Sequence, residues 1–289
     1  MNESEEYAQI IAGSSRSMEP TSTHLGKSGT LRMPVYAVLF DIYGTLFISG
    51  SGDISAARQK ADVDLMEKLL QKFGFSRPPG AIFDAFYREI EKAHSQKRDA
   101  GVLFPEVEVD KIWMNVLDIS DRLLARKFAL EYEVLFNPVW PMPGLEEVLN
   151  LLHRKVMKMG IISNAQFFTP YVFKAFLGRF PEHLGFEKSL VLYSFKYGHA
   201  KPSPVLFRMA EKRLRDMGIK AGEAVFVGND MRNDIFPAAM EGFQTALFGG
   251  DTRSLRMGHQ GTGSTAMGPD LIVTNLKELS DYIVTLNEG

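Results

Sequence analysis

One short run near the N-terminus constrains the fold more than any other feature of the sequence. Residues 35–40 are apolar without a break and rich in β-prone side chains, and they end directly at Asp41. A strand that is apolar on both faces suits a buried position in a parallel sheet, whereas a strand with one wet face alternates apolar and polar residues. The run therefore predicts a buried parallel strand with an acidic side chain at its carboxyl end.

From residue 141 onward, helical and strand patterns alternate along the chain. Strands are predicted at 157–163, 190–192, 224–228, 245–248 and 271–273. Helices are predicted at 145–155, 168–178, 202–217 and 276–285, and a further helix is predicted to end near residue 242. A glycine-rich loop covers 249–268. Such alternation implies right-handed crossovers and a doubly wound parallel sheet, in which ligands bind beyond the carboxyl ends of the strands. The predicted fold class is α/β.

Residues 51–138 interrupt this pattern with apolar stripes at helical spacing, and no strand pattern of any strength lies between them. We predict an all-helical insertion there, with 34–50 and 139–289 forming the α/β domain. Residues 1–33 are polar and lack a sustained period, so we predict an arm that stays outside the core. We hypothesise that the natural start is Met18 or Met33.

The composition excludes several classes of function. The 289 residues carry a formal net charge of −2, so no global positive field would recruit nucleic acid or an acidic membrane. The absence of cysteine excludes disulfide scaffolds, thiolate metal sites and thiol nucleophiles. No apolar run approaches the length of a membrane span, and Glu3, Glu5 and Glu6 stand where a signal peptide would be basic. We expect a cytoplasmic protein whose partner is a small molecule.

Polar residues follow three of the predicted strands, at the edge where ligands would bind, and a lysine lies in a loop that could reach them. They are Asp41, Ser163, Asn164, Asn229, Asp230 and Lys201. A carboxylate such as Asp41 can attack phosphorus or carbon and form a covalent intermediate. Ser163 and loop amides can hold an anionic group, and Lys201 can neutralise developing negative charge. Asp41 and Asp230 together would attract Mg²⁺, which favours one or two carboxylates plus waters and substrate oxygens.

These residues and their neighbours resemble the four ordered motifs of the haloacid dehalogenase (HAD) superfamily. The motifs are Asp41-Ile42-Tyr43-Gly44-Thr45-Leu46, Ser163-Asn164, Lys201-Pro202, and Gly228-Asn229-Asp230 through Asn233-Asp234. Each motif alone is weak, but all four occur in order and at predicted strand ends. The resemblance covers about 34–289 and implies a Rossmann-like core with a helical cap at 51–138. It also implies Asp41 as nucleophile, Ser163 as phosphate or carboxylate ligand, Lys201 as charge stabiliser and the acidic fourth motif as a Mg²⁺ site.

Two departures from this pattern point to different reactions. Phosphatases of the superfamily carry an Asp two residues after the nucleophile as general acid and base, and this chain has Tyr43 there. A phenol with an ordinary pKa of about 10 is a poor base. Tyr43 is typical of the family's 2-haloacid dehalogenases, whose halide leaving group needs no proton, although its backbone carbonyl could still face a metal. Those dehalogenases use no metal and have few acids in the fourth motif, whereas this chain keeps Asp230 and Asp234.

Several roles follow from the motifs. Asp230 is predicted as a metal ligand, with Asn229 as the alternative, and Asp230 could also be a helix N-cap. Asp234 is predicted either to support the metal or to hold Lys201. Thr45, Asn164 and Arg88 are candidate substrate-binding residues. Arg88 lies in the second insertion helix, where a dehalogenase would present an arginine to the substrate carboxylate, although most helical arginines are solvated.

The leading hypothesis is a Mg²⁺-dependent phosphatase of small organic phosphates that acts through a phospho-Asp41 intermediate. One alternative is a metal-independent 2-haloacid dehalogenase, and another is a binding or regulatory module that turns nothing over. The sequence leaves open the physiological substrate and whether the protein is a monomer or a homodimer, because fold-level analogy supplies neither.

Overall fold

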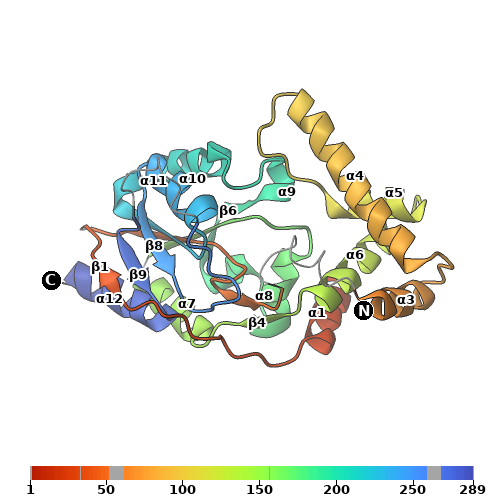
Figure 1. Cartoon of the computed structure of the whole chain (residues 1–289). Helices are drawn as coiled ribbons and strands as arrows, with labels where there is room; N and C mark the ends of the chain where they lie inside the picture. Colours follow the sequence, from red (N-terminus) through yellow and green to blue (C-terminus); the bar gives the residue numbers. More distant parts are fainter. Residues whose placement is uncertain (1, 33, 52–61, 156, 259–267, 289) are drawn as a thin grey trace.

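A seven-stranded sheet forms the centre of the protein in the computed structural model, which describes residues 2–32, 34–51, 62–155, 157–258 and 268–288 (Figure 1). The strand order is β1-β9-β8-β7-β2-β5-β6. The strands are β1 (Ser28–Gly29), β2 (Ala37–Phe40), β5 (Lys158–Ser163), β6 (Phe186–Tyr193), β7 (Ala224–Gly228), β8 (Gln244–Phe248) and β9 (Leu271–Val273). Among them, only the pair of β1 and β9 is antiparallel. The predicted doubly wound, mostly parallel sheet is confirmed.

Helices cover both faces of this sheet. They are α7 (Leu145–Arg154), α8 (Thr169–Leu177), α9 (Ser194–Tyr197), α10 (Pro204–Asp216), α11 (Phe236–Met240) and α12 (Leu276–Glu288), with 3₁₀ turns at Pro181–Leu184 and Ala221–Glu223 and a π-helical turn at Met231–Ile235. Successive side chains of a strand point to opposite faces. Val38 and Phe40 of β2 accordingly pack in one core with α7 and α12, whereas Ala37 and Leu39 pack in a second core with α10.

The insertion after β2 is helical as predicted, although residues 52–61 lie outside the described part of the chain, as do residues 259–267 of the predicted glycine-rich loop. Its helices are α3 (Val63–Lys72), α4 (Pro79–Asp99), α5 (Val109–Leu117) and α6 (Arg122–Phe136), and we call them the cap. Trp113 is fully buried at their centre and stacks on Phe86, with 4.4 Å between the ring centroids. The connections to the cap are β3 (Phe47–Ser49) and β4 (Val139–Pro141), which pair antiparallel.

The N-terminal segment corrects the prediction of a polar arm outside the core. Residues Glu3–Ser14 form α1, which packs against α8 and α6, and its Tyr7 and Ile11 are fully buried. The Tyr7 ring meets that of Tyr171 edge-on, with 5.1 Å between centroids. The sequence pattern failed here because only Tyr7, Ala8 and Ile11 form the buried stripe. Little more than one helical turn of apolar residues does not stand out in a polar segment.

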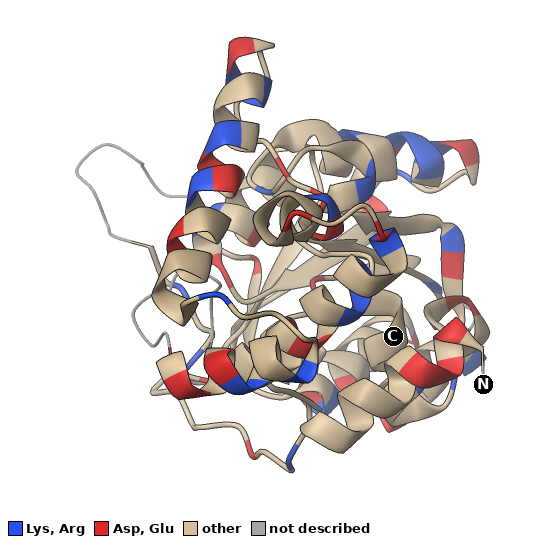
Figure 2. Cartoon of the chain, turned by 90° about the vertical axis from the view of Figure 1, so that its right-hand side faces the viewer, with Lys and Arg blue, Asp and Glu red and all other residues tan. Residues whose placement is uncertain are grey.

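Charges of both signs are interspersed over the side of the molecule that carries the cap (Figure 2). On α4, for example, Lys92 lies 3.5 Å from Glu89, and Arg98 pairs with Glu91. Among the residues that the structure describes, no helix combines the length and the apolar character needed to cross a membrane.

Replacement of Ile11 by alanine is expected to lower the free energy of unfolding by about 2–4 kcal/mol, because it removes a fully buried side chain and leaves a cavity. Gln9→Ala, on the exposed face of the same helix, should change it by less than about 0.5 kcal/mol. Urea denaturation followed by tryptophan fluorescence measures both. Equal stability of Ile11→Ala and wild type would contradict the packing of α1 into the core.

Candidate active site

Three polar residues lie at the carboxyl ends of neighbouring strands. Asp41 directly follows β2, Ser163 ends β5 and Asn229 directly follows β7. Because β2 pairs with β5 on one side and with β7 on the other, the strand order brings these three ends to one edge of the sheet. This edge is where open α/β sheets bind their ligands.

The side chain of Lys201 joins two carboxylates at this edge. Its Nζ donates to Oδ1 of Asp41 at 2.6 Å and to Oδ1 of Asp234 at 2.5 Å. The exposed fraction of the side chain is 3% for Lys201, 9% for Asp41 and 2% for Asp234. Removing each charge from water costs several kcal/mol unless it is paired and hydrogen-bonded. The three groups therefore depend on one another.

The backbone of Lys201 is also fixed. Oδ1 of Asn164 accepts a hydrogen bond from the backbone N–H of Lys201 at 2.7 Å, and Nδ2 of Asn164 donates to the backbone oxygen of Lys201 at 3.2 Å. Asn164 directly follows β5, so this pair of bonds holds the loop before α10 against the sheet edge. Asn164 thus positions Lys201 in addition to lining the pocket described below.

The second carboxylate oxygen of Asp234 closes the loop after β7. Oδ2 accepts hydrogen bonds from the backbone N–H groups of Asn229 and Asp230, both at 3.0 Å. The Asp234 side chain lies so close to the backbone at position 228 that this residue must be glycine, because a Cβ there would lie 2.4 Å from Cγ of Asp234. The spacing of the fourth motif therefore brings the Asp234 side chain back to the carboxyl end of β7.

Burial and charge oppose each other in setting the pKa values of this group. Burial lowers the pKa of Lys201, but the carboxylates of Asp234 and Asp41 raise it by more, so its net shift is upward. Burial raises the pKa of Asp234, and Lys201 opposes that rise without cancelling it. One ammonium shared between two buried carboxylates explains both directions, and Lys201 keeps its charge.

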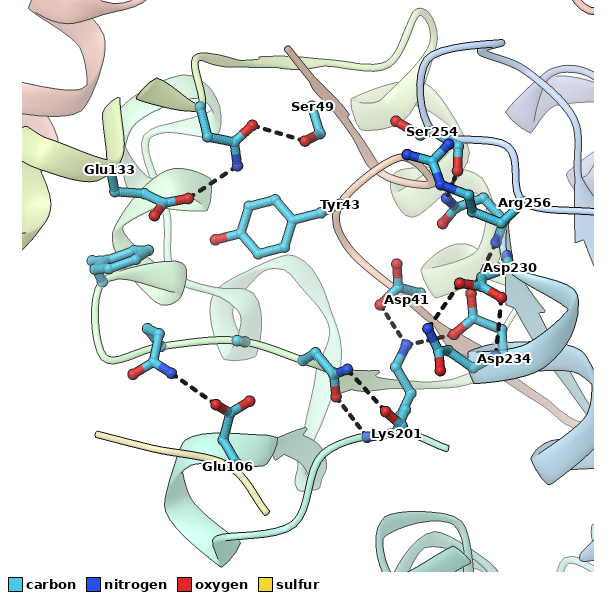
Figure 3. Close-up of a pocket in the computed structure, with 17 residues that line it drawn as sticks. Asp41, Tyr43, Ser49, Glu106, Glu133, Lys201, Asp230, Asp234, Ser254 and Arg256 are labelled. Carbon is cyan, nitrogen blue, oxygen red and sulfur yellow. Dashed lines mark hydrogen bonds and ion pairs between the residues drawn. The ribbon is translucent and has the colours of Figure 1, made fainter. Parts of the chain in front are cut away.

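A cavity of about 200 Å³ lies over this group and is lined by both the sheet edge and the cap (Figure 3). Asp41, Lys201 and Asp234 lie on one side of it. Glu133 of α6 and Glu106 of the loop before α5 lie on the other side. The cap therefore contributes acidic side chains to the wall that faces the nucleophile candidate.

Tyr43 projects into this cavity between the two walls (Figure 3). Its hydroxyl lies 3.0 Å from Oγ1 of Thr169, within hydrogen-bond distance. Burial raises the pKa of the phenol further above its ordinary value. Tyr43 is therefore a neutral hydrogen-bonding group here, and its ionisation is disfavoured.

Asp230 lines the cavity and also caps the turn that follows it. Its Oδ1 accepts from the backbone N–H groups of Arg232 at 2.8 Å and Asn233 at 3.0 Å, and its Oδ2 accepts from Nδ2 of Asn233 at 2.8 Å. The N-cap role is thus present in the structure. Each carboxylate oxygen has two lone pairs, so Oδ2, which accepts one hydrogen bond, can still bind a further group.

Asn229 and Thr45 tie loops together beside the cavity. Oγ1 of Thr45 donates to Oδ1 of Asn229 at 3.1 Å, and Nδ2 of Asn229 donates to the backbone oxygen of Ser254 at 2.6 Å. Both polar atoms of the Asn229 side chain are therefore used within the protein. Thr45 is fully buried and lies behind the cavity wall.

Ser163 and Arg88, like Thr45, are predicted substrate ligands that lie outside the cavity lining. Ser163 is fully buried at the end of β5, and its hydroxyl has no hydrogen-bond partner within the described part of the chain. Arg88 is exposed on α4 and lines a separate hollow with Asn115. Phe86 of the same helix is buried in the cap core. Arg88 comes two residues later, about 200° further around the helix axis, and therefore lies on the outer face. The structure therefore does not bring Arg88 to the site.

The sequence prediction missed several polar and charged residues of the cavity wall, which come from the cap and its connections, the loop between β5 and α8, and the loop that follows β8. These residues are Ser49, Glu106, Glu133, Asn137, Gln166, Ser254 and Arg256. One signal was available for Glu133. It is an acid close to the predicted junction between the insertion and the sheet, a position that does not by itself show which way its side chain faces.

Sequence comparisons point to one family and one partial relative. The family model for haloacid dehalogenase-like hydrolases matches residues 35–242. A ribulose-1,5-bisphosphate 5-phosphatase from Halopiger xanaduensis is 34% identical over 94 residues, which is 32% of this chain and 38% of that protein. The match therefore spans well under half of that relative.

Solved structures with a similar fold include two dehalogenases. A 2-haloacid dehalogenase from Pseudomonas syringae pv. Tomato DC3000 has a TM-score of 0.57 at 21% identity, covering 87% of this chain and 99% of that chain. An L-2-haloacid dehalogenase from Xanthobacter autotrophicus, with chloropropionic acid covalently bound, has a TM-score of 0.52 at 17% identity and the same coverage of 87% and 99%. At these identities the likeness establishes the fold alone.

Replacement of Lys201 by methionine is expected to lower the free energy of unfolding at neutral pH by about 3–5 kcal/mol, because it leaves two buried carboxylates without their shared cation. The double variant Lys201→Met/Asp234→Asn should recover part of that loss, since it removes one of the unpaired charges. Urea denaturation of both variants measures these differences. A single variant as stable as wild type would contradict the ion group described above.

Proposed function

Because the chain belongs to the haloacid dehalogenase-like hydrolase family, we propose that it is a Mg²⁺-dependent phosphatase that hydrolyses small organic phosphates through a phospho-Asp41 intermediate. The contact between Asp41 and Lys201 and the acidic character of the pocket support this proposal. The partial relative from Halopiger xanaduensis, which is named as a phosphatase, supports it as well.

The charge balance of the pocket is the observation that carries the proposal. Carboxyl groups outnumber basic side chains in its lining. The acids are Asp41, Glu106, Glu133, Asp230 and Asp234, and the bases are Lys201 and Arg256. Lys201 is already shared between Asp41 and Asp234, so a phosphate dianion beside Asp41 in this enclosed site lacks a counter-charge unless a further cation accompanies it. A divalent cation would provide that compensation.

The available oxygen ligands suit Mg²⁺. This ion needs only one or two carboxylates, because it keeps several waters and binds substrate oxygens. Asp41 uses one oxygen for Lys201, and its side chain has no other partner in the described ranges. Asp41, Asp230 and the backbone carbonyl of Tyr43 would hold the ion, which would neutralise charge on the phosphoryl oxygens. No set of three or more His, Cys, Asp or Glu side chains in those ranges forms a metal cluster, so water and substrate would complete the coordination.

In the proposed reaction, the carboxylate of Asp41 attacks phosphorus and forms an aspartyl phosphate while the bond to the leaving oxygen breaks. Lys201 orients the Asp41 side chain, and its charge stabilises the negative charge that develops in the transition state. Asn164 and Asp234 hold Lys201 in this position from two sides. Water then attacks phosphorus, which releases inorganic phosphate and restores Asp41.

A metal-independent 2-haloacid dehalogenase is the second candidate, and Tyr43 is the observation that favours it. In that reaction Asp41 would attack carbon, and the halide would leave without a proton. The carboxylate of a 2-haloacid would, however, find no basic side chain among the described residues of the cap wall, where Glu106 and Glu133 lie. Arg88, the arginine that could have paired with it, lies on the outer face of α4.

The purified protein is expected to hydrolyse p-nitrophenyl phosphate in the presence of Mg²⁺ and to lose this activity in EDTA. Asp41→Asn should lower turnover by about 10³-fold or more, because it removes the nucleophile. Asp230→Asn keeps an oxygen for the N-cap but removes the charge, so it should raise the Mg²⁺ concentration needed for half-maximal activity. Release of p-nitrophenolate measures all three, and Asp216→Asn, at the exposed end of α10, is the control.

Two results would contradict this function. Chloride release from 2-chloropropionate in EDTA, with no turnover of a panel of phosphate esters, would favour the dehalogenase. Thermal stabilisation by a phosphate ester without turnover, unchanged in Asp41→Asn, would indicate a binding module.

A further inference from the structure

A phosphatase with Tyr43 at this position needs another proton donor for its leaving group. The alkoxide of an alkyl phosphate leaves poorly, and general acid catalysis typically accelerates such steps by about 10²–10⁴-fold. The Tyr43 hydroxyl is within hydrogen-bond distance of Thr169, and burial raises the pKa of the phenol. Tyr43 is thus a weak acid in this environment and is poorly suited to take a proton back from water.

Glu133 places a carboxyl group on the opposite wall of the same cavity. It lies on α6, and Figure 3 shows its carboxyl beyond the hydroxyl end of Tyr43, on the cap side. Its Oε1 accepts a hydrogen bond from Nδ2 of Asn137 at 2.9 Å, and no hydrogen bond to its second oxygen occurs among the described residues. One oxygen positions the group, and the other can meet a substrate.

The junction between the cap and the sheet fixes the position of this carboxyl. Oδ1 of Asn137 accepts hydrogen bonds from Oγ of Ser49 at 2.8 Å and from Oγ of Ser51 at 2.8 Å. Ser49 ends β3, and Asn137 lies two residues before β4. The amide of Asn137 therefore connects Glu133 to both chain connections of the cap. Supporting hydrogen bonds of this kind hold a reacting group in a defined direction.

Glu106, the other acid on the cap wall, accepts structural hydrogen bonds on both of its oxygens. Its Oε2 accepts from Oγ of Ser194 at 2.6 Å, and its Oε1 accepts from the backbone N–H of Val107 at 2.9 Å and from Nε2 of Gln166 at 3.3 Å. Both oxygens are used to tie the cap loop to the sheet. Glu133 is therefore the acid on this wall with an oxygen that accepts no hydrogen bond from the described residues.

The surroundings of Glu133 favour its protonated form. Burial raises the pKa of this carboxyl above its ordinary value, and the hydrogen bond from Asn137 opposes the rise without cancelling it. The titratable groups that face it are the phenols of Tyr43 and Tyr132. A carboxyl group kept neutral in this way can act as a general acid.

We propose that Glu133 donates the proton to the leaving group and later activates water, within the phosphatase reaction proposed above, on which this inference rests. As Asp41 attacks, the phosphorus–oxygen ester bond breaks, its electron pair stays on the leaving oxygen, and that oxygen takes the proton of Glu133. The Glu133 carboxylate then takes a proton from the water that attacks phospho-Asp41. Phosphate leaves, and Asp41 and the acid form of Glu133 are restored. The substrates are phosphate monoesters of alcohols.

Glu133→Gln tests this role, because glutamine keeps the size and can accept the bond from Asn137 but cannot supply the proton. Its kcat/KM for glycerol 3-phosphate should fall by about 10²-fold or more. With p-nitrophenyl phosphate, whose leaving group departs without a proton, the burst of p-nitrophenolate should keep its rate within about 3-fold, followed by slow turnover. The selective loss distinguishes proton transfer from a general loss of structure.

Glu131→Gln is the matched control, since Glu131 lies on the same helix and pairs with the exposed Lys72. It should leave both substrates unaffected. Equal losses on the two substrates in Glu133→Gln, or a wild-type enzyme that hydrolyses p-nitrophenyl phosphate but no alkyl phosphate, would overturn the role of Glu133 and leave the phosphatase function standing. A wild-type protein that hydrolyses neither ester with Mg²⁺ would overturn the function, and the role of Glu133 with it.

Discussion

The ammonium group of Lys201 holds two buried carboxylates that lie far apart in the sequence. Asp41 comes from the end of β2 and Asp234 from the turn after β7, and Lys201 reaches them from the loop before α10. None of these charges would be stable in the sheet edge without the others. The group therefore requires the observed order of β5, β2 and β7, and it also sets the direction of the Asp41 side chain on which the proposed chemistry depends.

The cap complements this edge with a different kind of acid. Asp41 is paired with a cation, whereas Glu133 is hydrogen-bonded to the neutral amide of Asn137, and burial raises the pKa of its carboxyl. Two carboxyl groups whose environments differ in this way are suited to the separate roles of nucleophile and proton donor. Because Asn137 lies at the junction of β3 and β4, the contacts that attach the cap to the sheet also fix the position of the Glu133 carboxyl in the pocket.

The sheet and the cap could be predicted from the sequence because both depend on repeated apolar patterns. Those patterns gave β2 and β7 close to their observed bounds and the helical character of the insertion. Helix α1 could not be predicted, since its buried stripe of Tyr7, Ala8 and Ile11 is too short to stand out. The two-residue strand β1 is shorter still, and only its pairing with β9 makes it visible.

The meeting of Asp41, Lys201 and Asp234 could be predicted because the carboxyl ends of neighbouring parallel strands share one edge. The placement of the cap residues could not. Whether Arg88 or Glu133 reaches the pocket depends on the rotation of each helix and on how the cap closes over the sheet, and neither is encoded locally. An isolated acid in an amphipathic helix has the same sequence pattern whether it faces solvent or a substrate.

The most direct test of the central claim is mass spectrometry of the peptide that contains Asp41, after rapid quenching of the enzyme with Mg²⁺ and p-nitrophenyl phosphate. We predict a phosphoryl group on Asp41 in the wild type and none in Asp41→Asn. Absence of that adduct in an active wild-type enzyme would contradict the account, as would a carboxyalkyl ester on Asp41 formed from 2-chloropropionate in its place.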